Sequence, residues 1–228
     1  MSEKQNLILV PGLGCDQAVW QHQLHHLNDI ANLIVADVHG CETPQAIVEA
    51  IIQHAPYEFA LAGHSLGGWM CLEVLKEYSH RVTKLCLMST GADKDDHISF
   101  ERRRHRLAMI EAGKYAEICD ELADLFTYNK NIEPIVKKMF LRNEALFVTQ
   151  QHAALLRESS KELLPTLTLP TMVIVGKEEP LFYESSELIA HHVPGAQFEV
   201  IDDCGHMITL EKPEEVTALM RRWLDLTE

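Results

Sequence analysis

The sequence predicts an α/β fold, with a mainly parallel sheet of about six strands that is flanked by helices and interrupted by a helical insertion. Short apolar runs alternate with stretches of helical period at both ends of the chain, which is typical of a parallel sheet. The middle of the chain has helical patterns and no strand pattern. The length of 228 residues and the apolar content of 46% suit one compact domain. We therefore expect a core from residues 1–90 and 165–228, with an insertion at residues 91–164.

The first third of the chain contains three apolar runs separated by two helical stretches. The runs, each followed by turn residues, are residues 6–10, 32–38 and 57–63. The helical stretches between them are residues 18–27 and 44–54. Thr43 suits an N-cap, and Pro44 suits the first helical position that follows it. This part therefore predicts a βαβαβ arrangement with two crossover helices.

The alternation continues with a helix at residues 67–78 and a strand at residues 84–89, and it resumes after the insertion. The later elements are expected in the order strand, helix, strand, helix, at residues 171–176, 184–192, 197–202 and 213–226. Pro194 and Gly195 are suitable residues to end the first of these two helices.

Charge and hydropathy argue against a nucleic-acid partner, a membrane span and a signal peptide. Twenty Lys and Arg residues against 34 Asp and Glu residues give a formal charge of −14, which repels polyanions, so we expect no nucleic-acid partner. No apolar run approaches the roughly 20 residues that span a bilayer. The first six residues are polar, where a signal peptide needs a basic patch and an apolar stretch. We expect a cytoplasmic protein without a membrane partner.

The cysteines and histidines do not form a metal-binding pattern. The six cysteines include no CxxC pair, and a chain of this length buries a core without disulfides, so reduced thiols are expected. His22, His25 and His26 stand at helical spacing, which suggests either a metal site or a solvated, half-buried helix face. No carboxylate or cysteine at matching spacing completes a site, so we favour the helix face and expect no metal.

The strongest chemical signal is the sequence GHSLGG at residues 63–68, between a predicted strand and a predicted helix. A serine at such a strand-to-helix turn is held in a strained conformation with its hydroxyl exposed above the sheet edge. The flanking glycines are needed because a Cβ there collides with neighbouring backbone. Ser65 is therefore the candidate nucleophile. The alternative is a glycine-rich turn used only for packing or for binding phosphate.

A serine hydroxyl needs a base to activate it and a third group to orient that base. His206 is the best base, because it follows the last predicted strand and lies on a loop at the same sheet edge as Ser65. The acid is expected on the loop after the preceding strand, where Glu178 and Glu179 are both available. We choose Glu179. His64 is too near Ser65 along the turn to reach its hydroxyl, so we interpret it as a packing residue.

The oxyanion of the transition state needs preorganised backbone donors. One candidate is the amide of Leu66, at a helix N-terminus where the dipole favours negative charge. The other is the amide of Leu13, in the glycine-containing loop 11–14 after the first strand. Such a loop also suits phosphate binding, but neither GxGxxG nor GxxxxGK[ST] is present, which argues against a nucleotide.

Over nearly its whole length the chain resembles the α/β-hydrolase fold superfamily. The resemblance is carried by residues 9–14 with Trp20, 63–68, 175–181, 193–196, and 204–207 through 211–213. It implies a cofactor-independent hydrolase with a Ser, His and acid triad, and a cap domain inserted at residues 91–164. Within the superfamily the chain looks most like small cytoplasmic carboxylesterases, enol-lactonases and carbon–carbon bond hydrolases.

The sequence departs from the family pattern at four places. The family's usual His-Gly pair is Pro11-Gly12 here, and the acid is Glu179 where relatives usually have Asp. The family's first hairpin is missing, so all strands are expected to be parallel. The loop at residues 40–43 is short, which is expected to reshape one wall of the pocket.

The predicted cap contains candidates for substrate binding. Met109, Phe126, Met139, Phe140 and Phe147 either line an apolar acyl site or pack within the cap helices. Further candidates are Trp20, Met207 and Arg104.

The run at residues 102–106 is the one basic cluster in an acidic chain. We interpret it as a solvated helix face. A guanidinium turned inward is the alternative, and it favours acidic esters, lactones or acyl-CoA.

The primary hypothesis is a serine hydrolase that acts on small carboxylic esters, lactones or thioesters through an acyl-enzyme. The alternative is a ligand-binding or sensing module of the same fold, with slow or no turnover. Dehalogenase chemistry is disfavoured because it needs a carboxylate at the position of Ser65. We expect a small-molecule partner and a monomer or small homo-oligomer.

Overall fold

The computed structural model describes residues 4–226 and contains a six-stranded sheet in the order β2-β1-β3-β4-β5-β6. Every neighbouring pair of strands is parallel, which confirms the expected fold class. The ends of the predicted core, residues 1–3 and 227–228, lie outside the described residues. The strands are β1 (Gln5–Val10), β2 (Ala31–Val35), β3 (Phe59–His64), β4 (Val82–Met88), β5 (Thr171–Gly176) and β6 (Gln197–Ile201).

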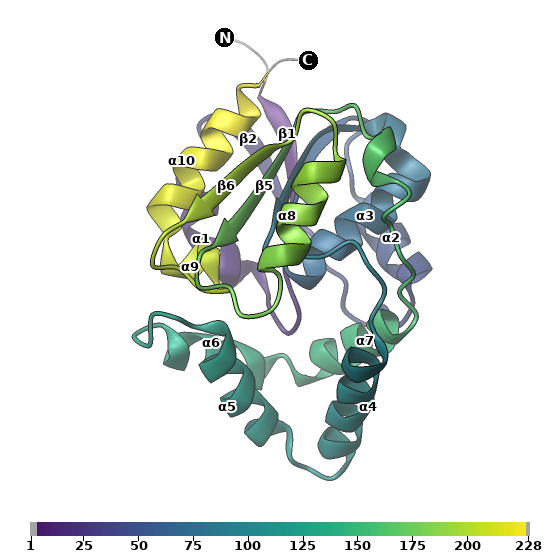
Figure 1. Cartoon of the computed structure of the whole chain (residues 1–228), viewed down its shortest axis with the longest axis vertical. Helices are drawn as coiled ribbons and strands as arrows, with labels where there is room; N and C mark the ends of the chain where they lie inside the picture. Colours follow the sequence, from purple (N-terminus) through teal and green to yellow (C-terminus); the bar gives the residue numbers. More distant parts are fainter. Residues whose placement is uncertain (1–3, 227–228) are drawn as a thin grey trace.

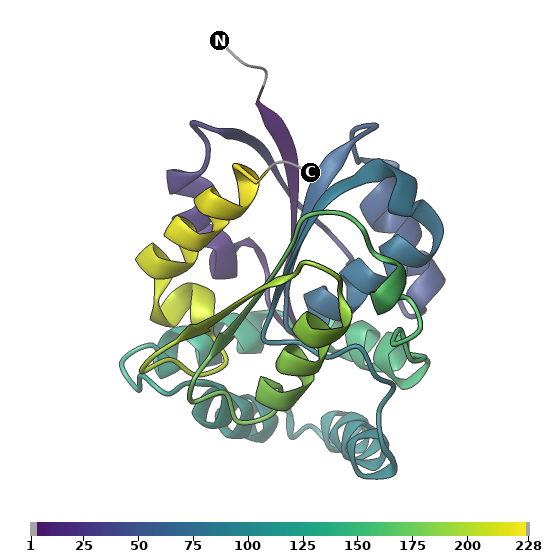
Figure 2. The same ribbon diagram turned by 45° about the horizontal axis from the view of Figure 1, so that its top comes forward.

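Helices cover both faces of the sheet (Figures 1 and 2). On one face lie α1 (Gln21–His26) and α10 (Pro213–Leu224), and on the other lie α2 (Pro44–Gln53), α3 (Leu66–Tyr78) and α8 (Tyr183–His192). Short helical segments join them: η1 (Gln17–Trp20), η2 (Ser79–Arg81), η3 (Leu164–Thr166) and α9 (Ile208–Glu211). The helix α9 was not predicted from the sequence.

The central strands are mostly buried because helices pack on both sides of the sheet. Every residue of β3 and of β5 is buried, whereas the edge strands β2 and β6 are mostly half-buried. The predicted N-cap at Thr43 is present, since its hydroxyl accepts a hydrogen bond from the amide of Ala46 at 3.2 Å. The spacing of apolar residues and the capping residues were therefore sufficient to predict where these strands and helices lie in the chain.

Four helices separate β4 from β5, and we call them the cap. They are α4 (His97–Glu111), α5 (Tyr115–Phe126), α6 (Glu133–Arg142) and α7 (Glu144–Leu155). In Figure 1 they lie below the carboxyl ends of the strands, with α5 beside α6 and α4 beside α7. The predicted absence of strands from this stretch holds for all the residues between β4 and β5. The cap therefore covers the sheet edge on which the loops after the strands converge.

Polar contacts connect the cap to the core. The guanidinium of Arg142 in α6 donates from Nε to Asp16 Oδ2 and from one terminal nitrogen to Asp16 Oδ1, each at 2.7 Å. Asn143 donates to the same carboxylate at 2.9 Å and to the carbonyl of Gly14 at 3.2 Å. Paired donors on a carboxylate have a defined geometry, so these contacts orient the cap over the loop after β1.

Among the helices of residues 4–226, none is both long enough and apolar enough to cross a bilayer. All six cysteines are unpaired thiols. In this part of the chain no three His, Cys, Asp or Glu side chains gather as a metal site requires. His22 stacks on His26 with ring centroids 4.2 Å apart and hydrogen-bonds to Thr217 of α10 at 2.8 Å, so this helix face packs against the core.

The end of β5 packs tightly against the loop after β6. A Cβ built on Gly176 would lie 2.2 Å from the carbonyl oxygen of Cys204, whereas a Cβ on Gly195 would meet nothing within 4 Å. We expect Gly176→Ala to lower the free energy of unfolding by about 3 kcal/mol or more, because two backbone segments must separate. Urea unfolding measures this loss.

The matched control is Gly195→Ala. The residue has a φ of 74°, so the substitution introduces only the cost of a left-handed conformation, about 1 kcal/mol. Equal losses in the two variants would contradict the close packing inferred at Gly176.

Candidate active site

Ser65 occupies the sharp turn between β3 and α3. Its φ of 56° and ψ of −123° lie outside the conformations that a non-glycine residue ordinarily adopts, at a cost of about 1–3 kcal/mol. Two hydrogen bonds hold the turn. The amide of Ser65 donates to the carbonyl of Met88 at 2.8 Å, and the hydroxyl of Thr90 donates to the carbonyl of Ser65 at 2.7 Å. The turn directs the serine side chain toward the cap.

The glycines around Ser65 are required by close contacts between backbones. A Cβ on Gly67 would lie 2.2 Å from the carbonyl oxygen of Val10, and a Cβ on Gly63 would lie 2.4 Å from that of Gly67. The collisions expected from the sequence are thus confirmed. They show that α3 begins in direct contact with the end of β1.

The imidazole of His206 lies between the serine and an acid. Its Nε2 is 2.8 Å from Ser65 Oγ, and its Nδ1 is 2.8 Å from Glu179 Oε2. The three residues follow β3, β5 and β6, whose carboxyl ends share one edge of the sheet. All three are buried. The ring centroids of Phe126 and Phe182 lie 4.4 and 5.6 Å from the ring centroid of His206. The site is shielded from water on these sides.

Glu179 determines how His206 holds its proton. An ionised carboxylate only accepts hydrogen bonds, so Nδ1 of His206 donates to it and Nε2 is left to accept the Ser65 hydroxyl proton. Burial by itself raises the pKa of Glu179, but the charge and hydrogen bond of His206 and the amide of Leu181 hold that pKa below its usual value. The other oxygen of Glu179 accepts from the amides of Leu181 and Phe182 at 3.0 and 3.3 Å.

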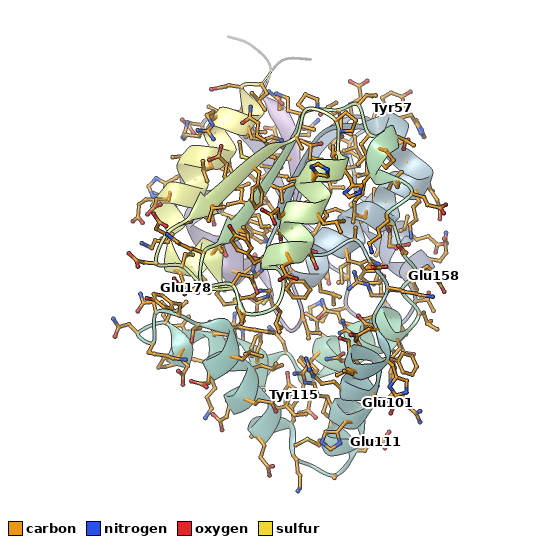
Figure 3. All side chains as sticks on the ribbon, viewed as in Figure 1. Tyr57, Glu101, Glu111, Tyr115, Glu158 and Glu178 are labelled. Atoms are coloured by element: carbon orange, nitrogen blue, oxygen red, sulfur yellow. The ribbon has the colours of Figure 1, made fainter. Side chains whose placement is uncertain are left out.

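Glu178, the alternative acid, points away from this site. Its side chain is exposed, and Figure 3 shows it at the outer margin of the molecule, where the core meets the cap. The structure therefore brings Glu179, and not Glu178, against the imidazole.

His64 is more than a packing residue. It is fully buried, and its Nε2 is 2.8 Å from the carbonyl oxygen of His206, an atom that only accepts hydrogen bonds. Nε2 of His64 is therefore the protonated nitrogen, and it fixes the backbone that carries the His206 ring. Burial, together with the neighbouring His206, lowers the pKa of His64 to about 3, so its ring is neutral near neutral pH.

The two predicted oxyanion donors come from different elements, Leu13 from the loop after β1 and Leu66 from the start of α3. Leu13 and Leu66 line the same cavity of about 170 Å³ as the serine. In the described part of the chain, the amides of these two residues donate no hydrogen bond to another residue. Free donors beside a nucleophile are what an oxyanion requires.

The apolar lining of the cavity comes mostly from the core, from Leu13, Leu66, Leu181 and Phe182, and little of it comes from the cap. Of the apolar candidates, Phe126 lines the cavity. The others are packed within the cap or the core and do not line it: Trp20, Met109, Met139, Phe140, Phe147 and Met207. For the cap residues among them, the structure favours the other alternative given from the sequence, packing within the cap, because the apolar face of a cap helix packs against the neighbouring helices. Phe140, for example, packs edge-on against Phe126 and close to Gly14.

The basic cluster of α4 divides between two faces of the helix. Arg102, Arg103 and Arg106 line the cavity, together with Arg157 from the segment after α7. Arg104 is 63% exposed and lies 3.6 Å from Glu101, which Figure 3 shows on the outer side of α4. The prediction of Arg104 as a substrate-binding residue was therefore wrong, and so was the prediction that the whole cluster is solvated. Arg157 was missed because its sequence neighbourhood is not basic.

A larger hollow of about 1030 Å³ opens on the other side of the loop after β1. Its lining includes Asp16, Asp37, His39 and Arg142 but none of Ser65, His206 and Glu179. The loop at residues 40–43, expected to reshape a wall of the pocket, lines neither cavity. The chemistry therefore assigns the candidate active site to the smaller cavity.

Comparison with known proteins agrees with this arrangement. The sequence model described as the alpha/beta hydrolase family matches residues 7–219. The chain belongs to this family.

A structure of a thermophilic esterase from Thermogutta terrifontis, solved with malate bound, is 27% identical with a TM-score of 0.89, over 96% of this chain and 89% of that one. The enol-lactonase from Burkholderia xenovorans LB400 shares the fold, at 14% identity and a TM-score of 0.84 over 99% and 93% of the two chains. The 2-hydroxymuconate semialdehyde hydrolase of Pseudomonas putida is 27% identical over 72% of this chain. The match spans 61% of that relative's length, less than two thirds.

In this α/β-hydrolase the loop after β1 is held by a glutamine from the cap. Gln150 in α7 is fully buried, accepts from the amide of Gly14 at 2.7 Å and donates to the carbonyl of Gly12 at 3.3 Å. The two bonds flank Leu13 and orient its amide. Sequence reasoning missed this residue. The sequence signal was weak, because the helix that contains Gln150 and Gln151 also contains Glu144, Thr149 and His152.

The buried neutral state of His64 makes stability depend on pH. Between pH 6.5 and about 3 the unfolded chain binds a proton at His64 that the folded protein excludes, so the free energy of unfolding falls as the pH falls through this window. We expect His64→Asn to reduce this slope by up to about 1.4 kcal/mol per pH unit. Urea unfolding at several pH values measures it.

His191→Asn is the control, because His191 is exposed at the end of α8. Its slope should match that of the wild type. An unchanged slope in His64→Asn would show that this ring accepts a proton in the folded protein.

Proposed function

We propose that this protein is a serine hydrolase that acts on small carboxylic esters, lactones or thioesters through an acyl-enzyme. The observation that carries the proposal is His206, whose two ring nitrogens each lie 2.8 Å from a partner, Ser65 Oγ on one side and Glu179 Oε2 on the other. The named activities of the relatives, among them an esterase, an enol-lactonase and a semialdehyde hydrolase, support the same class of reaction.

The reaction begins with attack by Ser65 Oγ on the carbonyl carbon of the substrate. As the new C–O bond forms, His206 Nε2 takes the hydroxyl proton, and Glu179 offsets the positive charge on the ring. The carbonyl oxygen becomes an oxyanion that accepts from the amides of Leu13 and Leu66. The bond to the leaving group then breaks, and His206 returns the proton to the departing alcohol or thiol.

Water completes the cycle. It attacks the acyl carbon while His206 Nε2 takes one of its protons, and collapse of the second tetrahedral intermediate releases the carboxylic acid and restores the Ser65 hydroxyl. The groups that act are the three side chains, two backbone amides and water. The neutral His64 leaves the site with one imidazole that changes charge during the reaction.

Labelling of Ser65 tests the proposal directly. An active-site-directed fluorophosphonate should modify the wild-type protein at Ser65, identified by peptide mass spectrometry, and methyl esters of short acids should be hydrolysed. Ser65→Ala and His206→Ala should each reduce kcat by about 10⁴- to 10⁶-fold, with little further loss in the double variant because the pair acts as a unit.

Absence of both labelling and turnover in the wild-type protein would contradict a hydrolase. If a small ester or acid then raised the Tm, the result would favour a binding or sensing module.

The position of the acid is tested by comparing neighbouring glutamates. Glu179→Gln should reduce kcat by roughly 10²- to 10⁴-fold, because an amide no longer holds the imidazole in its working tautomer. Glu178→Gln is the matched control and should change kcat by less than about twofold, since an exposed carboxylate contributes little. A larger loss in Glu178→Gln than in Glu179→Gln would overturn the assignment of the acid.

A further inference from the structure

The cavity that contains Ser65 is positively charged, although the chain as a whole has a formal charge of −14. Four arginines line it, and Asp95 is the single carboxylate among its lining residues. The arginines are Arg102, Arg103, Arg106 and Arg157. A surplus of cations around a small, partly closed space attracts an anion.

Asp95 already accepts hydrogen bonds from one of these arginines, Arg103. Arg103 donates to both of its oxygens, from Nε and from a terminal nitrogen, the second contact at 3.3 Å. Arg157 approaches Asp95 only to 3.8 Å, beyond hydrogen-bond distance. The carboxylate of Asp95 therefore balances Arg103 and leaves the other buried arginines without a close partner in the cavity.

Arg106 is buried with few polar partners among the described residues. The residue is 9% exposed, and its Nε is buried without a hydrogen-bond partner. Within residues 4–226 its one carboxylate contact is to Glu121 at 3.4 Å, and the side chain of Glu121 is 59% exposed. Burial lowers the pKa of Arg106, which means that its surroundings disfavour the cation without an additional anion.

Arg157 has a similar environment. It is 8% exposed, its Nε is also buried without a partner, and one terminal nitrogen donates to the carbonyl of Gly91 at 3.0 Å. Its guanidinium lies 5.5 Å from the ring centroid of Trp69, an aromatic contact that orients the group. Two buried guanidiniums with unused donors thus face one cavity.

We propose that Arg106 and Arg157 form a subsite for a carboxylate of the substrate, so that the preferred substrates are short esters or lactones that carry a second, free carboxylate. This inference rests on the proposed function of the same site. The planar fork of a guanidinium matches a carboxylate.

The size of the cavity limits the substrate. A volume of about 170 Å³ is below the roughly 300 Å³ at which pockets for drug-sized ligands begin. The acyl chain between the ester and the free carboxylate is therefore short. Monomethyl glutarate and methyl valerate make a matched pair of probes, because they share the methyl ester and the chain length and differ in a terminal carboxylate against a methyl group.

The test measures kcat/KM for both esters by titration of the released acid. The wild-type protein should prefer monomethyl glutarate by at least about 10-fold, and Arg106→Met should lower kcat/KM for this ester by about 10- to 100-fold, mainly through KM. Its value for methyl valerate should change by less than about threefold. Arg104→Met, on the outer face of α4, is the control and should leave both values unchanged.

Equal losses for both esters in Arg106→Met would assign this arginine a structural role and overturn the proposal. A wild-type preference for methyl valerate would overturn it as well. Fluorophosphonate labelling of Arg106→Met at the wild-type rate shows that the rest of the site is intact.

Direct binding separates this inference from the proposed function. Titration calorimetry with glutarate on Ser65→Ala should show binding that is weakened at least about 10-fold in the Ser65→Ala/Arg106→Met double variant. If Arg106→Met weakens glutarate binding in this way but the wild-type protein hydrolyses neither ester, the result would support the subsite and reject the hydrolase. Turnover of methyl valerate without any binding of glutarate would support the hydrolase and reject the subsite.

Discussion

The close packing of α3 against the end of β1 is the contact on which the rest of the site depends. Gly67 touches the carbonyl of Val10, with no room for a side chain. This contact, with the hydrogen bonds from Ser65 to β4 and from Thr90, holds Ser65 in a conformation that the residue would not adopt alone. It also places the start of α3 beside the loop that carries Leu13. One packing contact thus positions the nucleophile and both backbone donors.

Burial gives the charged groups of the site their separate roles. His64 is buried with one hydrogen bond and is neutral, whereas Glu179 is buried among donors and stays ionised. Burial of Arg157 lowers its pKa to about 10, because Asp95 is too distant to compensate fully. Electrostatic interactions are stronger in the low dielectric of the protein interior than in water, so each group keeps a defined charge state.

Local patterns predicted the core more completely than the cap. The strands, Thr43 and the glycines around Ser65 follow from period, capping and steric constraints within a few residues of chain. Ser65, His206 and Glu179 come together because loops after parallel strands share one edge, so the order of elements was sufficient to predict the juxtaposition. In the cap, the same apolar pattern fits a residue that faces the cavity and one that faces a neighbouring helix. Phe126 and Phe140 are not distinguishable on that basis, although only Phe126 lines the cavity.

The sequence by itself determined the α/β class, the parallel sheet, the sharp turn at Ser65 and the candidate residues that follow the strands, because each depends on short-range sterics or on the alternation of elements. Only the tertiary structure decided which arginines face the cavity and that Gln150 holds the loop around Leu13. These outcomes depend on how helices rotate about their axes and on which distant groups compensate buried charge. Residues far apart in the chain set both, so no local pattern encodes them.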